Sequence, residues 1–129
     1  MKESQLKLLS EKHLGVNMTT DLKNKILSNK DDLIEGTFCY LLFEEAKYDE
    51  SLLSEFIDDV AMFFEKETSD DEIIKLLSWM IRGVDICFNS HNDKDDLYHI
   101  VNYDAEKEIS WEKIWKPKLI SFQQKPEVY

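Results

Sequence analysis

The chain has 129 residues, of which 43% are apolar and 12% aromatic, and its formal net charge is −11. A chain of this length buries roughly two-thirds of the surface that it exposes when unfolded, so we expect one domain over residues 1–129. Its acidity is concentrated, because residues 31–75 hold fifteen acidic residues against three lysines, a net charge of −12. Phosphate groups repel such a chain, which argues against direct binding to nucleic acid or to an anionic membrane.

Helix-breaking residues are few. There are three glycines and two prolines, and both prolines lie in the last thirteen residues. This composition favours helices over a β fold with many turns, and we predict a mainly α fold, a single-domain bundle of about five helices. Strand-forming side chains at 97–103 and 118–122 also predict a small two-stranded β element near the C-terminus, with a helix over 97–103 as the alternative.

The first two predicted helices are short and carry most of the basic charge. One spans about residues 4–14 and ends at Gly15, because glycine readily adopts the left-handed conformation that closes a helix. After a loop at 16–18, Thr19 or Thr20 is placed to cap the second helix. The outward lysines of the second helix are Lys23, Lys25 and Lys30.

A third helix is predicted from about residue 30 to residue 47, where Gly36 indicates either close packing or a local break. The fourth helix, capped by Asp49 or Ser51, has the clearest amphipathic pattern, because its apolar residues recur three and four positions apart. Its predicted core stripe consists of Leu52, Leu53, Phe56, Ile57, Val60, Ala61 and Phe64.

The fifth predicted helix begins at a capping box, in which Ser69 and Glu72 satisfy each other's exposed amide groups. The stretch that follows is apolar on nearly all sides, so this helix should be central. Its predicted core residues are Trp79, Met80, Val84, Cys87 and Phe88. A last helical turn is predicted around Trp111 and should end near Pro117.

The sequence predicts a soluble protein of the cytoplasm. The N-terminal residues lack the apolar run of a signal peptide, and no segment approaches the roughly 20 apolar residues that cross a bilayer. Cys39 and Cys87 stand alone within apolar runs, a pattern typical of buried, reduced thiols rather than of a disulfide framework.

No residue pattern indicates catalysis. The histidines lack the spacing of a zinc site, and neither a nucleophile motif nor a phosphate-binding glycine loop occurs. Asp93 and Asp95 imitate the start of a calcium loop, which however lacks its glycine. We therefore expect no enzymatic activity, no cofactor and no small-molecule substrate. A metal-dependent enzyme built from His91, Asp93, Asp95 and His99 is an alternative that a metal analysis would test.

The polar side of the fourth helix is acidic and includes one methionine. A charged helix face is either a solvated surface or a site that steers a basic partner, and Met62 favours binding because it offers an adaptable apolar contact. The acids at the start of the fifth helix extend this surface. The candidate partner-binding residues are Glu55, Asp58, Asp59, Met62, Glu65, Asp70 and Asp71. The sequence leaves open whether the lysines of the first two helices cover them.

In size, acidity and predicted helix content the whole chain resembles the immunity proteins encoded beside bacterial polymorphic toxins, including those of contact-dependent growth inhibition. Its strongest parts are DESLLSEFIDDVAMFFEKE and SDDEIIKLLSWMIRGVDICF. The resemblance implies an inhibitor whose carboxylates occupy the basic cleft of a cognate toxin domain, in particular a nuclease. The alternative is an acidic regulatory adaptor or nucleic-acid mimic that occupies the basic groove of a DNA-binding protein.

Overall fold

A computed structural model describes residues 14–30 and 34–124. Within these ranges the chain is helical and contains no strand, so the mainly α class is confirmed and the predicted β element is not present. The predicted helix at 4–14 lies outside the described residues, apart from Leu14. The helical elements are α2 (Leu14–Leu27), a 3-10 turn (Ser28–Lys30), α3 (Phe38–Glu45), α4 (Glu50–Lys66), α5 (Asp71–Asn92), α6 (Ala105–Ser110), a π-turn (Trp111–Trp115) and α7 (Lys116–Gln123).

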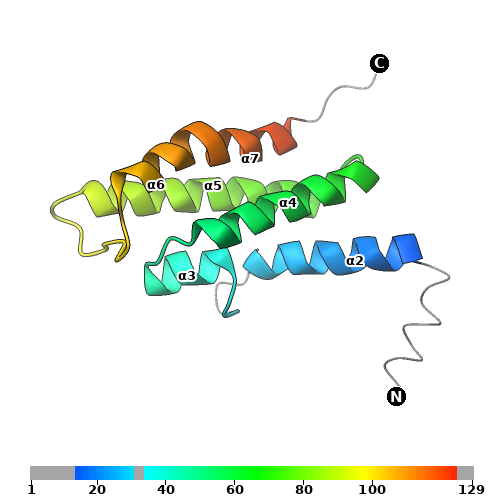
Figure 1. The fold of residues 1–129 in the computed structure, drawn as a ribbon, viewed down its shortest axis with the longest axis horizontal. Coiled ribbons are helices and arrows are strands. Elements are labelled where there is room, and N and C mark those ends of the chain that lie inside the picture. The colour runs from blue at the N-terminus through cyan, green and yellow to red at the C-terminus, as the bar shows by residue number, and fades with distance from the viewer. Residues whose placement is uncertain (1–13, 31–33, 125–129) are drawn as a thin grey trace.

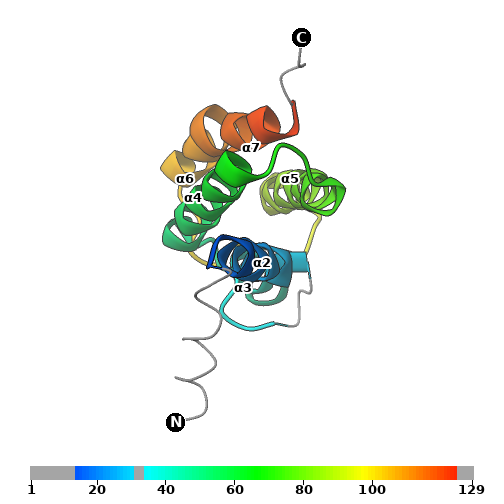
Figure 2. The ribbon, with the colours of Figure 1, turned by 90° about the vertical axis from the view of Figure 1, so that its right-hand side faces the viewer.

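The helical elements form a bundle of rods, and successive rods along the chain run antiparallel to each other (Figure 1). Helices α2 and α3 lie end to end and make one rod, while α6, the π-turn and α7 run on as another. Viewed along the bundle, α4 and α5 occupy opposite sides, between the α2–α3 rod and the α6–α7 rod (Figure 2). The core between the rods is apolar and aromatic, and its largest fully buried side chains are Trp111, Tyr48, Phe38, Phe63, Ile26 and Leu42.

The N-terminal rod differs from its prediction. Helix α2 begins at Leu14 and runs through the predicted loop at 16–18, so Gly15 does not end a helix there. The third predicted helix is interrupted, since Gly36 has a φ of +90° and the chain re-enters a helix only after Thr37. The Thr37 side chain caps α3 by accepting a hydrogen bond from the Tyr40 N–H, so the local-break interpretation of Gly36 is confirmed.

Helices α4 and α5 are close to their predictions. Asp49 caps α4, as one of the two predicted capping residues, and accepts from the Leu52 N–H. Helix α5 begins one residue later than predicted, because Asp70 rather than Ser69 is its N-cap and accepts from the Ile73 N–H. An aspartate carboxylate is as good a cap as a serine hydroxyl and also complements the helix dipole, so the predicted capping box is wrong in register.

The C-terminal segments are not strands, because their backbone groups find other partners. At 97–103 the Val101 N–H donates to the Ala46 carbonyl at 2.8 Å, and the Ile100 N–H donates to Nδ1 of His91 at 3.0 Å. The stretch 118–122 lies within α7. Pro117 does not end the helix, since it falls in the first turn of α7, directly after the π-turn, where a missing N–H is tolerated.

No described helix is both long and apolar enough to span a membrane. Cys39 and Cys87 are both buried, as predicted, and neither forms a disulfide with a described residue. Burial also raises the pKa of the Cys87 thiol, against a smaller opposing effect of a hydrogen bond with Tyr98. Cys87 therefore behaves as a small apolar side chain of the core and not as an activated nucleophile.

Candidate partner-binding surface

Helix α4 turns one narrow face to solvent. Asp58 and Glu65 are exposed, and Met62 between them has 45% of its surface exposed. On the opposite side Phe56 and Phe63 are buried. The predicted core stripe is therefore slightly rotated: its members Ala61 and Phe64 are half-buried, whereas Phe63, which was not assigned to the core, is 1% exposed.

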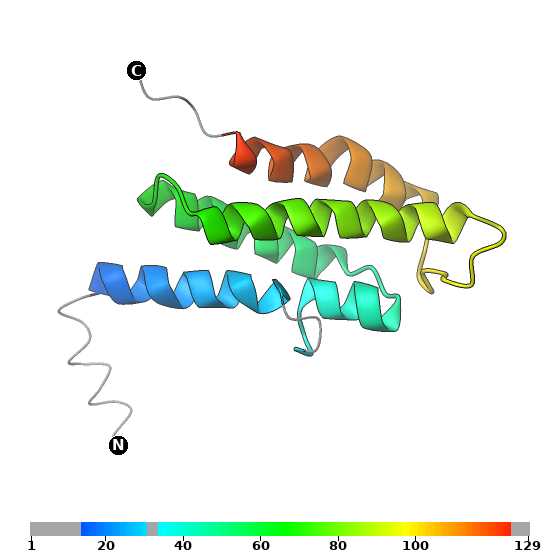
Figure 3. The same ribbon diagram turned by 180° about the vertical axis from the view of Figure 1, so that it is seen from behind.

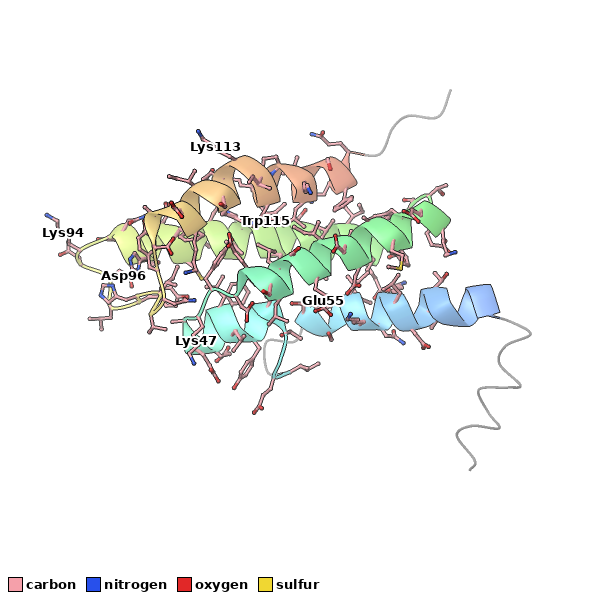
Figure 4. The ribbon with its side chains drawn as sticks, in the orientation of Figure 1. Lys47, Glu55, Lys94, Asp96, Lys113 and Trp115 are labelled. Carbon is pink, nitrogen blue, oxygen red and sulfur yellow. The ribbon has the colours of Figure 1, made fainter. Side chains whose placement is uncertain are left out.

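Two of the predicted site carboxylates are occupied by a lysine of α2. The Nζ of Lys25 lies 2.7 Å from a carboxylate oxygen of Glu55 and 3.0 Å from one of Asp59, and these bonds raise the pKa of Lys25. Asp59 is only 9% exposed and faces α2 rather than solvent. Figure 4 shows Glu55 at the junction of α4 with α2. Lys25 of α2 thus covers part of the acidic side of α4, and its ion pair with Asp59 joins the two helices.

A second lysine of α2 joins the start of α5. The Nζ of Lys23 lies 2.9 Å from carboxylate oxygens of both Asp70 and Glu72, and the hydrogen bonds that Lys23 donates to these carboxylates raise its pKa to about 12. Asp70 therefore caps α5 and binds Lys23 at once. Its neighbour Asp71 is exposed and forms no ion pair with any described residue. Of the two acids predicted here, only Asp71 is available to a partner.

Asp70 should make the stability of the bundle depend on pH. Burial acts to raise its pKa, but the bonds from Lys23 and from the Ile73 N–H outweigh this effect and lower it. A lowered native pKa stabilises the fold above the unfolded value of about 3.9, and the stabilisation is lost as the pH falls through the native value. We expect Asp70→Ser, which keeps a capping oxygen, to cost about 1 kcal/mol at pH 6 and less near pH 3.

Urea unfolding of both proteins at these two pH values tests this prediction. Asp71→Ser is the matched control, because Asp71 neither caps the helix nor pairs with a described lysine. A free-energy difference between the Asp70→Ser variant and the parent that is the same at both pH values would contradict the role given to the ion pair.

Of the predicted site residues on α4, two carboxylates and one methionine are exposed and lie outside the ion pairs with α2 that are described above. We define the α4 acidic face as Asp58, Met62 and Glu65; neither carboxylate has an ion-pair partner in the part of the chain that the structure describes. Beside it, a groove of about 290 Å³ runs between α2 and α4, and Leu22, Met62 and Phe63 are among the residues that line it. Sequence reasoning missed this groove, because Leu22 and Met62 are far apart in the chain and only the packing of α2 on α4 brings them together.

The histidine and aspartate side chains at 91–99 serve the local backbone. Nδ1 of His91 accepts from the Ile100 N–H, its ring stacks on Tyr103 at 4.0 Å, and Asp93 accepts from the Asp95 N–H. Among the residues at 14–30 and 34–124, no three metal-ligating side chains are grouped so that they would hold an ion. The metal-enzyme alternative therefore has no geometric support in this region.

Comparisons with known proteins give no family. No protein-family model matches the chain, and neither the curated proteins nor the solved structures contain a match. The arguments about function consequently rest on the charge, exposure and packing of this chain's own residues.

Proposed function

We propose that this protein is an immunity protein that binds and neutralises a cognate basic toxin domain, such as a nuclease. The observation that supports it most directly is the α4 acidic face, where two exposed carboxylates flank a half-exposed methionine at the edge of an apolar groove. Carboxylates at fixed positions on a helix substitute for the phosphates that a nuclease cleft binds, and Met62 with the groove supplies an apolar anchor.

The bundle holds this face in place before any partner arrives. Asp49 caps the helix, and Lys25 ties its middle to α2 through Glu55 and Asp59. A preformed surface loses little side-chain and backbone entropy on binding. The net charge of −11 steers a basic domain towards the protein, while specificity comes from the few groups in contact.

A protection assay in cells tests this proposal. The chain is co-expressed with the toxic domain encoded by the neighbouring gene, and survival is compared for the parent, for Asp58→Lys/Glu65→Lys, and for Asp95→Lys/Glu106→Lys. Both variants change the net charge equally, but Asp95 and Glu106 are exposed acids away from α4. We expect only the α4 variant to lose protection, by about 100-fold or more in survival, because each reversed contact opposes docking.

Full protection by the α4 variant would contradict the assignment of this face. The neighbouring gene also separates the two acidic-inhibitor hypotheses: a secreted protein with a toxic C-terminal domain supports immunity, whereas a transcription or restriction component supports the nucleic-acid mimic.

A further inference from the structure

Helix α5 exposes a second face, on the side of the bundle opposite to α4 (Figures 2 and 3). Lys75 and Arg82 are exposed there, Ile86 is 60% exposed, and Trp79 is half-buried. Neither cation forms an ion pair with a described residue. We define these four residues as the α5 basic face. On a chain with a net charge of −11, two unpaired cations around a tryptophan are a distinct local surface.

The tryptophan of this face is held in position and stands beside a hollow. The ring of Trp79 packs edge-on against Phe43, with 5.4 Å between their centroids. A groove of about 500 Å³, lined by Lys30, Glu72, Lys75, Leu76 and Trp79, opens next to it. A preordered aromatic ring at the edge of a groove is typical of the residues that supply binding energy at protein interfaces.

The two exposed faces match in spacing and are opposite in charge. On α4 the order is acid, methionine four positions on, and acid three positions further, at Asp58, Met62 and Glu65. On α5 the same steps give a base, a tryptophan and a base, at Lys75, Trp79 and Arg82. At about 1.5 Å of rise per residue, both charged pairs span about 10.5 Å. If the two helices pack parallel, all three residues of one face align with those of the other. If they pack antiparallel, the charged residues still align, and Met62 is displaced from Trp79 by one residue, about 1.5 Å.

We propose that the α4 acidic face of one copy of this chain docks on the α5 basic face of a second copy. Carboxylates then meet Lys75 and Arg82, and Met62 packs on Trp79, a favourable sulfur–aromatic contact. Because the two faces lie on opposite sides of the bundle, the contact joins copies head to tail and leaves a free face at each end. Chains of copies grow with concentration instead of stopping at a dimer.

The association is weak and depends on salt in two ways. Exposed ion pairs contribute about 0–1 kcal/mol each, and one helix face is a small interface, so the contact is transient. Copies of charge −11 repel each other at low salt, where the Debye length is about 30 Å. Near physiological salt that repulsion is screened while the contact pairs persist, and at about 1 M salt the pairs also weaken.

Sedimentation velocity over a concentration series tests the proposal with the protein alone. At about 0.15 M salt, we expect the weight-average mass to about double between low and high concentration. Each copy in a complex keeps a free face, through which it can bind a further copy. Lys75→Ser/Arg82→Ser and Asp58→Ser/Glu65→Ser should each remain monomeric. Their equimolar mixture should form a 1:1 complex that grows no further, because one intact face remains on each copy. The mixture also shows that both variants are folded.

Two results would overturn the proposal: a parent protein that stays monomeric at every concentration, or assembly that persists in both double variants. The control Asp95→Ser/Glu106→Ser should assemble as the parent does. Self-association shares the α4 acidic face with toxin binding, yet the two are separable. Lys75→Ser/Arg82→Ser should lose self-association and keep protection in cells, whereas failure of the immunity proposal would leave the sedimentation result unchanged.

Discussion

Replacing Trp111 with alanine is expected to destabilise the bundle by about 3–5 kcal/mol, a large part of the 5–15 kcal/mol that is typical of a domain. Trp111 is completely buried at the π-turn, where α6 continues into α7. Its indole Nε1 donates to Asp85 at 2.9 Å, and Lys116 contacts the other oxygen of the same carboxylate at 2.9 Å. The substitution removes a large apolar volume and one donor to Asp85, and both effects act in the same direction.

Two further variants divide this loss of stability into its parts. Trp111→Phe keeps a large aromatic ring but loses the indole donor and part of the apolar volume, so it should cost about 2–3 kcal/mol, less than Trp111→Ala. Trp115→Ala should cost less than Trp111→Ala, because Trp115 is half-buried and its Nε1 bonds to Glu50 at 3.2 Å near the surface. Urea unfolding followed by far-ultraviolet circular dichroism measures all three. A Trp111→Ala protein within 1 kcal/mol of the parent would contradict this packing account.

The second large loss of stability is expected on substitution of Asn102, whose side chain bonds the irregular segment 93–104 to the α3–α4 connection. Its side chain accepts from the Tyr48 N–H at 2.9 Å and donates to the Tyr48 carbonyl at 2.8 Å. Tyr48 is only 1% exposed, so truncation of Asn102 leaves two backbone groups short of partners. At about 1–3 kcal/mol per unsatisfied buried group, we expect Asn102→Ala to cost about 2–4 kcal/mol after partial access of water.

An exposed asparagine provides the matched control. Among the described residues, the Asn92 side chain bonds only to the carboxylate of Glu108, at 3.2 Å to each oxygen, and Asn92→Ala should change stability by less than about 0.5 kcal/mol. Hydrogen exchange gives a local measurement, because the Tyr48 amide should lose protection in Asn102→Ala and keep it in Asn92→Ala. Equal stability of the two variants would show that the segment is held by its other contacts.

The parts of the fold that could be predicted are those that local patterns determine. Helices α4 and α5 follow from apolar residues three and four positions apart, and Asp49, the N-cap of α4, is one of the two residues predicted for that position. The segment at 97–103 was mispredicted, since its strand-forming side chains find no partner strand. Its backbone is satisfied instead by the His91 side chain and the Ala46 carbonyl, partners that no local pattern contains, and by the Asp96 carboxylate, which accepts from the Tyr98 N–H.

The acidic surface was predictable in charge but not in availability. Helical spacing placed Glu55, Asp58 and Asp59 on the polar side of α4, yet Lys25, far earlier in the chain, binds two of them. Asp59 is 9% exposed because the packing of α2 on α4 covers it. Net charge and periodicity therefore identified the helix that carries exposed carboxylates, whereas only the tertiary structure separated the exposed Asp58 from acids that hold the bundle together.

The association rate constant with the toxin domain that we propose as the partner tests the central claim most directly. It should be measured for the parent, Asp58→Ser/Glu65→Ser and Asp95→Ser/Glu106→Ser, at about 50 mM and 500 mM salt. If the α4 acidic face binds the toxin, the first variant should associate about ten-fold more slowly at low salt, and the difference should shrink at high salt. Equal rate constants for the three proteins at low salt would contradict it.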